Sequence, residues 1–158
     1  MRLIAISSAI AAAALAASSL PAPAAGPAPN GAALFARCAA CHTATGKGVP
    51  GTYPPLGVDF RKLAAKPAGR RYIVLAVTRG LMGPITVEGK VYRGVMPAQS
   101  GMDDGQIAAV LNHVGTAIAT TGPTFRKFTP AEVASTRASG ATMSSGEVAK
   151  LHAAVGGG

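Results

Sequence analysis

Two cysteines and a histidine stand together in the segment Cys38-Ala39-Ala40-Cys41-His42, and the 158-residue chain has no other cysteine. On a helical turn, two thiols at this spacing can each add to one of the two vinyl groups of a haem. The histidine that follows then lies beneath the iron and supplies a nitrogen ligand. The pattern C-x-x-C-H is therefore a c-type haem attachment site. The sequence predicts one haem c, bound covalently through Cys38 and Cys41, with His42 as an iron ligand.

Other uses of a cysteine pair fit the sequence less well. A thioredoxin-like redox pair requires a βαβ setting, which the sequence does not indicate. A zinc site lacks its second pair of ligands, and an iron–sulfur cluster would need four thiolates. A disulfide between Cys38 and Cys41 would close a loop too short to stabilise the fold much. Haem attachment is thus the favoured interpretation.

A second axial ligand for the iron must come from elsewhere in the chain. The candidates are Met82, Met96, Met102, Met143, His113 and His152. Met96 is the predicted ligand because Pro97 restricts the backbone next to it, and a Met/His pair suits an electron-transfer haem. Methionine more often fills gaps in a core than binds a metal, and this simpler role fits Met82. Met102 and His113 stay open as second choices.

Helical periodicity dominates the middle of the chain. Asn30 can cap a short helix that runs through Phe35, and the Gly/Pro-rich residues 46–57 are predicted to form a loop. Apolar spacing predicts a helix over residues 70–79, and a capping box with apolar residues at helical spacing predicts another over residues 103–114. Alternation over residues 85–92 predicts a small β-hairpin.

Composition divides the chain into four predicted parts. Arg2 precedes an uncharged, Ala-rich apolar run, and the small residues up to Ala24 suit signal-peptide cleavage there. An uncleaved membrane anchor is the alternative, since the run approaches spanning length. The parts are a signal peptide (1–24), a linker (25–29), a haem domain (30–122) and a C-terminal extension (123–158). Within the extension, residues 130–138 and 144–155 have weak helical patterns, and the terminal glycines are expected to be mobile.

The haem is also expected to complete the hydrophobic core. Only 4% of the residues are aromatic and the chain has no tryptophan. A domain of about 90 residues with so few large side chains buries little apolar surface, and such small scaffolds usually need a cross-link or a cofactor. We therefore predict that the chain without haem is largely unfolded or molten.

A series of residues on both sides of the haem motif resembles the class I cytochromes c. In the family's order, these residues are Gly31, Phe35, Cys38-x-x-Cys41-His42, Pro54-Pro55-Leu56 and Met96-Pro97-Ala98. The resemblance covers about residues 30–120. It implies an all-α fold in which the N- and C-terminal helices cross beside one covalent haem. It also implies that Pro54 offers its carbonyl to the other ring nitrogen of His42, and that Leu56 packs on the haem.

Two features refine the resemblance. Residues 83–97 and 128–133 look most like a branch of single-haem domains that accompany periplasmic dehydrogenases or are fused to copper nitrite reductases. The family's last helix usually carries an aromatic residue where this chain has His113. The helix crossing near Phe35 is therefore expected to be looser or more polar.

The expected function is a periplasmic electron carrier rather than an enzyme. With His42 and Met96 both on the iron, the protein would move one electron without making or breaking substrate bonds. Two alternatives stay open. The protein could be a subunit bound obligately to a periplasmic dehydrogenase through its extension, or a haem enzyme whose open sixth position reduces peroxide or a nitrogen oxide.

The net charge of +9 bears on the partners. A basic cluster could steer the protein to acidic surfaces of a dehydrogenase, reductase or terminal oxidase. Its members are Arg61, Lys62, Lys66, Arg70 and Arg71. The alternative is that these are ordinary solvated helix residues. Nucleic acid is excluded as a partner by export and by the lack of nucleic-acid-binding features, and no stable membrane insertion is expected after signal cleavage.

Overall fold

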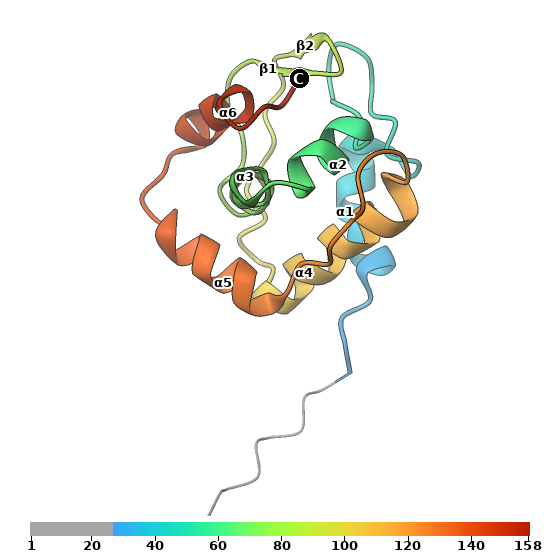
Figure 1. Cartoon of the computed structure of the whole chain (residues 1–158), viewed down its shortest axis with the longest axis vertical. Coiled ribbons are helices and arrows are strands. Elements are labelled where there is room, and N and C mark those ends of the chain that lie inside the picture. Colours follow the sequence, from blue (N-terminus) through green and yellow to red (C-terminus); the bar gives the residue numbers. More distant parts are fainter. Residues whose placement is uncertain (1–26) are drawn as a thin grey trace, which may run out of the picture.

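The computed structural model of the chain describes residues 27–158. The predicted signal peptide and the first two linker residues lie outside the described residues. The helices are α1 (Gly31–His42), α2 (Val58–Ala64), α3 (Pro67–Arg79), α4 (Asp104–His113), α5 (Pro130–Ser139) and α6 (Ser145–Ala154). A π-helical segment, η1 (Val114–Ile118), continues α4, and the strands are β1 (Ile85–Val87) and β2 (Lys90–Tyr92). The predicted all-α fold with one small hairpin is confirmed (Figure 1).

Helices α1 and α4 pack closely against each other, with Gly31 of α1 against Ala109 of α4. The Asn30 side chain accepts a hydrogen bond from the Ala33 amide (3.1 Å), which caps α1, and α4 begins with the predicted capping box of Asp103 and Gln106. The predicted first helix is longer than expected, because α1 runs on to His42. The haem motif therefore occupies its last turn.

The crossing is close at Gly31 and aromatic at Phe35. A Cβ on Gly31 would lie 2.2 Å from the backbone oxygen of Ala109, so only glycine fits there. His113 packs its ring on Phe35, with a centroid distance of 5.4 Å. His113 thus occupies the aromatic position of the crossing, and its polar ring does not keep the two helices apart.

The first testable consequence concerns this crossing. Gly31→Ala should destabilise the holoprotein by about 1–3 kcal/mol, because a backbone carbonyl cannot turn away from the new methyl group. Helix propensity alone would make the alanine variant more stable by about 1 kcal/mol. The sign of the measured change in stability therefore shows whether the steric clash or helix propensity dominates. Thermal unfolding is the measurement. Gly101→Ala, where an added Cβ would meet nothing within 4 Å, is the matched control and should leave the midpoint unchanged. A Gly31→Ala protein as stable as the wild type would contradict the close crossing.

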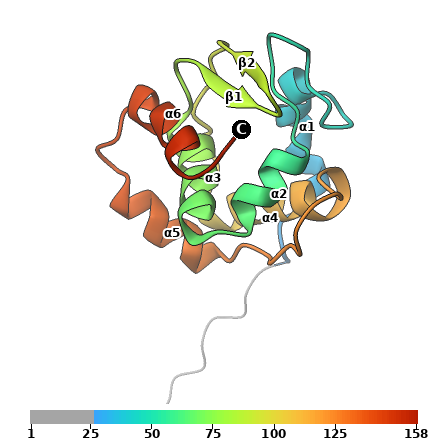
Figure 2. The ribbon, with the colours of Figure 1, turned by 45° about the horizontal axis from the view of Figure 1, so that its top comes forward.

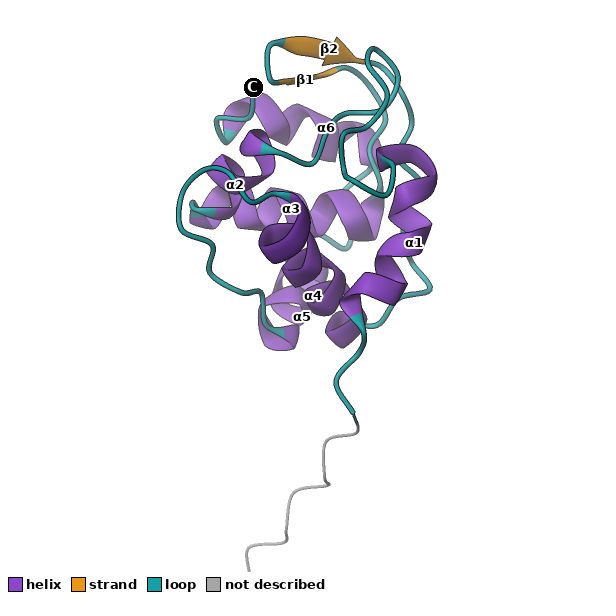
Figure 3. Ribbon diagram, turned by 90° about the vertical axis from the view of Figure 1, so that its right-hand side faces the viewer, coloured by secondary structure: helices purple, strands orange, loops and turns teal. Residues whose placement is uncertain are grey.

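Helix α3 passes through the middle of the molecule, and Val74 and Leu75 on it are fully buried. The hairpin predicted over residues 85–92 is confirmed, with Ile85 paired to Tyr92 and Val87 to Lys90. Its turn suits Glu88-Gly89, since both residues have positive φ (50° and 74°). Figure 3 shows the two strands at one end of the molecule, away from the start of α1.

The C-terminal extension is ordered and packs on the domain. Helix α5 lies against α3 and α4, and α6 lies against α3 and β1 (Figure 2). Val133 and Val148 are fully buried in these contacts. Both predicted helical patterns are confirmed. The expected mobility of the terminal glycines is wrong, because the Gly157 amide donates to the His152 carbonyl (2.9 Å) and the Gly158 amide to Asp59 Oδ1 (2.8 Å).

Two members of the predicted basic cluster hold this extension in place. Arg70 is buried and forms two 2.6 Å hydrogen bonds with the carboxylate of Glu132. Arg61 donates to the carbonyls of Gly115 (2.7 Å) and Pro123 (2.8 Å). The interpretation of all five residues as one solvent-facing cluster is therefore wrong. The pattern of charges could not reveal partners that lie some 60 residues away along the chain.

Candidate functional site

The last turn of α1 presents the haem motif to the interior. Cys38 and Cys41 are half-buried free thiols at i and i+3, which places them on one side of the helix. Burial raises the pKa of the Cys38 thiol, so this side chain stays protonated near neutral pH. A protonated thiol is a poor metal ligand and a poor redox nucleophile. Among residues 27–158, no three histidine, cysteine or acidic side chains are placed together to hold a metal ion.

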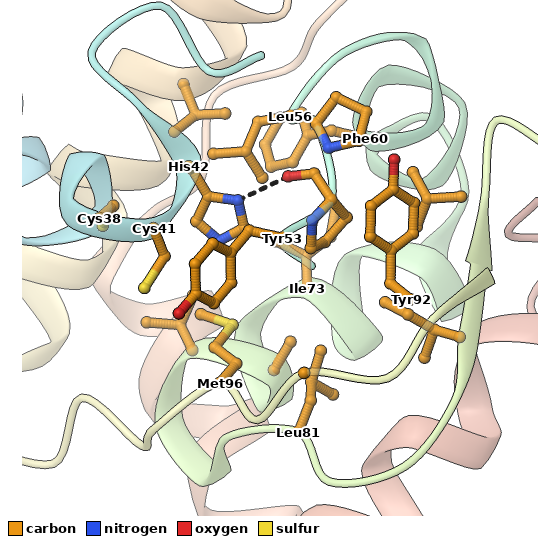
Figure 4. Close-up of a pocket in the computed structure, with 18 of the residues that line it drawn as sticks. Cys38, Cys41, His42, Tyr53, Leu56, Phe60, Ile73, Leu81, Tyr92 and Met96 are labelled. Atoms are coloured by element: carbon orange, nitrogen blue, oxygen red, sulfur yellow. Dashed lines mark hydrogen bonds between the residues drawn. The ribbon is translucent and has the colours of Figure 1, made fainter. Parts of the chain in front are cut away.

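His42 is buried and oriented by the loop that follows α1. Its Nδ1 lies 2.8 Å from the carbonyl oxygen of Pro54 (Figure 4). A carbonyl only accepts, so Nδ1 carries the proton and Nε2 keeps its lone pair. Burial lowers the pKa of His42, against the opposing effect of the hydrogen bond to Pro54. The residue is thus held as neutral imidazole, the form that binds a metal.

The loop brings Pro54 to His42 through a chain of backbone hydrogen bonds. Gly48 donates to the His42 carbonyl (2.9 Å), and Leu56 donates to the Gly46 carbonyl (2.7 Å). Gly48 has φ of +65°, and a Cβ there would lie 2.3 Å from the Tyr53 carbonyl oxygen. Glycine is required at this position, which explains part of the Gly/Pro richness that predicted a loop.

Met96 is held by the chain that leaves α3. Leu81 and Met96 form an isolated antiparallel bridge, with hydrogen bonds of 2.9 and 3.0 Å in both directions. Gly80 makes the bridge possible, since its φ is +76° and a Cβ would lie 2.4 Å from the Met96 carbonyl oxygen. Pro97 was the only stiffening element that the sequence indicated. The Leu81–Met96 bridge was missed, because Gly80 indicates only the end of a helix and the bridge joins segments that are not adjacent in the chain.

An apolar cavity separates His42 from Met96, and both side chains line it (Figure 4). Its walls come from α1, the loop after α1, α2, α3, the hairpin, the Met96 loop, α4 with η1, and α6. The lining side chains include the predicted residue Leu56 together with Phe60, Ile73, Leu81, Tyr92 and Val110. Both cysteines border the same cavity. An apolar space with two thiols at its edge, an imidazole on one side and a thioether on another fits a covalently attached haem.

The other candidate ligands have different surroundings. Met82 is 57% exposed, and Met143 lies outside the cavity with its sulfur 3.7 Å from Arg71. His113 packs on Phe35, as described above. Met102 and His152 do line the cavity, but Met102 is packed in the core and the Nε2 of His152 is bonded to Asp59 (2.9 Å). Met96 is the candidate that combines access to the cavity with a restrained backbone.

Comparisons with known proteins agree with this site. The cytochrome c family model matches residues 28–118. Cytochrome c-552 of Thermus thermophilus is 42% identical over 111 residues, which is 69% of this chain and 85% of the relative. A second cytochrome c-552, also from Thermus thermophilus, is likewise 42% identical over 111 residues, which is 69% of this chain and 75% of that relative.

Proposed function

Since this chain belongs to the cytochrome c family and is an electron-transfer haem protein with its haem c on Cys38 and Cys41, we propose that it is an exported one-electron carrier with His42 and Met96 as axial ligands. One observation supports the ligand pair above all. The chain brings a neutral imidazole and a restrained thioether to one apolar cavity that both attachment cysteines border. No helix among residues 27–158 has the length and apolar character needed to cross a bilayer.

The two ligands shape the chemistry in different ways. When bound, the haem supplies an iron that gains and loses one electron. Pro54 fixes the ring of His42 and its tautomer, so Nε2 can bind without reorganisation. The thioether of Met96 favours the reduced state and raises the potential relative to a second nitrogen ligand. His42 and Met96 would together hold the iron through side chains and would leave no position for a substrate, which favours electron transfer over the open-site enzyme.

The proposed partners are other redox proteins with acidic surfaces. Of the predicted basic cluster, Lys62 and Lys66 remain exposed, and the net charge of the chain is +9. Long-range attraction of this kind speeds encounter and weakens with added salt. Electron-transfer encounters bury less than about 1,200 Å², so a small contact suffices. The extension helices pack on this chain's own core, which weakens the alternative of an obligate dehydrogenase subunit that docks through them.

Replacing the methionine ligand should open the iron. We expect Met96→Ala holoprotein to bind carbon monoxide when reduced and to have a lower midpoint potential, because the thioether that favours the ferrous state is gone. Absorbance difference spectra and a potentiometric titration measure both effects. Met82→Ala, at an exposed methionine, is the matched control and should behave as the wild type. If Met96→Ala excludes carbon monoxide while Met102→Leu admits it, the ligand assignment is wrong.

Reversible one-electron titration of the wild-type holoprotein tests the carrier function itself. We expect a single one-electron step and no catalytic consumption of hydrogen peroxide or nitrite. Catalytic turnover of either compound would favour the enzyme alternative. Sequencing the N-terminus of the exported protein tests the proposed signal peptide, for which a start at Ala25 is expected. A protein that retains Met1 would favour the membrane anchor.

A further inference from the structure

A buried acid–base pair lies on the cavity wall and has no part in the ligation described above. Asp59 on α2 and His152 on α6 are both almost inaccessible, with exposed fractions of 4% and 2%. His152 Nε2 lies 2.9 Å from Asp59 Oδ2, although the two residues are 93 positions apart in the chain. Both border the cavity assigned to the haem. The pair joins the C-terminal extension to the redox site.

The C-terminal residues provide further hydrogen bonds and close contacts to this buried polar pair. Asp59 Oδ1 accepts a second hydrogen bond from the Gly158 amide (2.8 Å). The backbone of Gly157 is in close contact with the imidazole ring of His152. A Cβ at position 157 would lie 2.4 to 2.6 Å from three atoms of that ring. The terminal glycines therefore allow the chain to close over His152. An acceptor-only carboxylate requires the proton on Nε2, so Nδ1 is the atom that can take up another proton.

The other titratable groups named around the pair belong to α3, to its N-cap and to the hairpin turn. Tyr72 on α3 places its ring 5.1 Å from that of His152, and burial together with the charge of Asp59 raises the pKa of its hydroxyl. Tyr72 is thus neutral throughout the physiological range. Glu88 in the hairpin turn accepts from the Asp59 amide (3.4 Å), and Lys66 Nζ would lie 2.8 Å from a Cβ on Gly156. Among the side-chain types gathered here, histidine is the one whose charge ordinarily changes near neutral pH.

We propose that the Asp59–His152 pair is a proton-binding site coupled to the oxidation state of the haem. His152 takes up one proton from water at Nδ1 when the iron gains one electron, and it returns the proton when the electron leaves. The coupling follows from the shared cavity, because charges that line an apolar space interact more strongly than charges in water. This inference rests on the proposed one-electron function and adds a proton to it.

The sign of the effect follows from the charges. At low pH the imidazolium compensates the carboxylate of Asp59, and the pair is neutral. As pH rises, His152 loses its proton and one negative charge remains on the cavity wall. That charge favours the oxidised iron, so the midpoint potential falls. A unit charge at about 10 Å in a medium of intermediate dielectric changes an equilibrium constant on the order of ten-fold.

Midpoint potentials of the holoprotein at a series of pH values from about 5 to 9 test the proposal, since histidine titrates in this window. We expect the potential of the wild type to fall with rising pH, and that of His152→Gln, which keeps a donor for Asp59, to stay flat. His113→Gln is the matched control, at a histidine outside the cavity, and should keep the pH dependence. A slope in His152→Gln equal to that of the wild type would overturn the proposal.

A measurement on the unmodified protein covers the case in which the variant does not fold. Titration of the His152 ring by NMR should give a higher midpoint pH in the reduced holoprotein than in the oxidised one, since the linkage is reciprocal. Identical midpoints would overturn the proposal. A reversible one-electron wave without pH dependence would remove only the proton site. Loss of the reversible wave itself would instead contradict the electron-carrier function.

Discussion

Alanine in place of both Cys38 and Cys41 should yield a chain without haem and without the native helical fold. The buried residues form one core cluster, but α1, α2, α3 and α4 all turn part of their apolar surface to the cavity as well, so the haem is needed to complete that core. Without the haem, side chains such as Phe60, Ile73 and Val110 would face water or an empty space. Small domains have little stability in reserve, so we expect loss of folding rather than partial weakening.

Far-UV circular dichroism and haem content per chain measure this effect. The single variants Cys38→Ala and Cys41→Ala provide the comparison, since each retains one attachment thiol beside an unchanged His42. They should give much less holoprotein than the wild type, but the haem-containing fraction should be helical. A double variant with native helix content and no haem would show that the polypeptide folds unaided.

The second large effect is expected at Arg70. Its guanidinium is buried, bonds both oxygens of Glu132, donates to the Arg126 carbonyl (2.8 Å) and stacks 3.8 Å from the centre of the Phe128 ring. Arg70→Ala leaves these groups without their partner. Breaking a fully buried ion pair in this way costs about 3–5 kcal/mol, and since the Glu132 side chain is 24% exposed we expect a cost near the lower end of that range. We expect a correspondingly lower free energy of unfolding and faster proteolysis between α4 and α5.

The control for Arg70 is a cation of the same basic segment with no such partner. Lys62→Ala removes an exposed lysine of α2, and changes at exposed sites are usually within about 0.5 kcal/mol. Chemical denaturation of the holoproteins measures both variants. Equal losses in the two variants would mean that Arg70 acts only through net charge and does not hold the extension.

The same ion pair has a pH signature. The hydrogen bond from Arg70 holds the pKa of Glu132 below its usual range, against a smaller opposing effect of burial. A carboxylate with a depressed folded pKa stabilises the protein above its unfolded pKa, about 4.3 for glutamate, and loses that contribution as pH falls through the folded pKa. Glu132→Gln should therefore be less stable than the wild type at neutral pH, with a difference that shrinks in acid. Urea unfolding of both holoproteins at a series of pH values measures this difference.

Local signals in the sequence predicted much of the fold. The capping box at Asp103, the hairpin turn at Glu88-Gly89 and the helical patterns of the extension all depend on residues close together in the chain. Helix α2 was missed for the opposite reason. It has seven residues and no side-chain cap of its own, and the Asp59 amide in its first turn bonds instead to Glu88 from the hairpin.

In the candidate site, too, only the features formed by residues close together in the chain could be predicted from the sequence. The attachment cysteines and His42 form one short motif, and Pro97 pointed to Met96. The bridge from Leu81 to Met96 and the pair of Asp59 with His152 join distant segments, and neither half carries a signal alone. His152 was a candidate iron ligand by its residue type alone, and nothing in its weakly patterned segment indicated that it pairs with Asp59. Only the packing of α6 on α3 and β1 brings it to the haem cavity.

A carbon monoxide difference spectrum of the reduced, matured holoprotein tests the central claim most directly. The claim is that one covalent haem has both axial positions filled by His42 and Met96. We predict c-type haem absorbance that carbon monoxide leaves unchanged, because the iron has no vacant position. A clear shift on adding carbon monoxide would contradict the closed site and favour an enzyme with an open sixth position. Absence of haem absorbance would contradict the account as a whole.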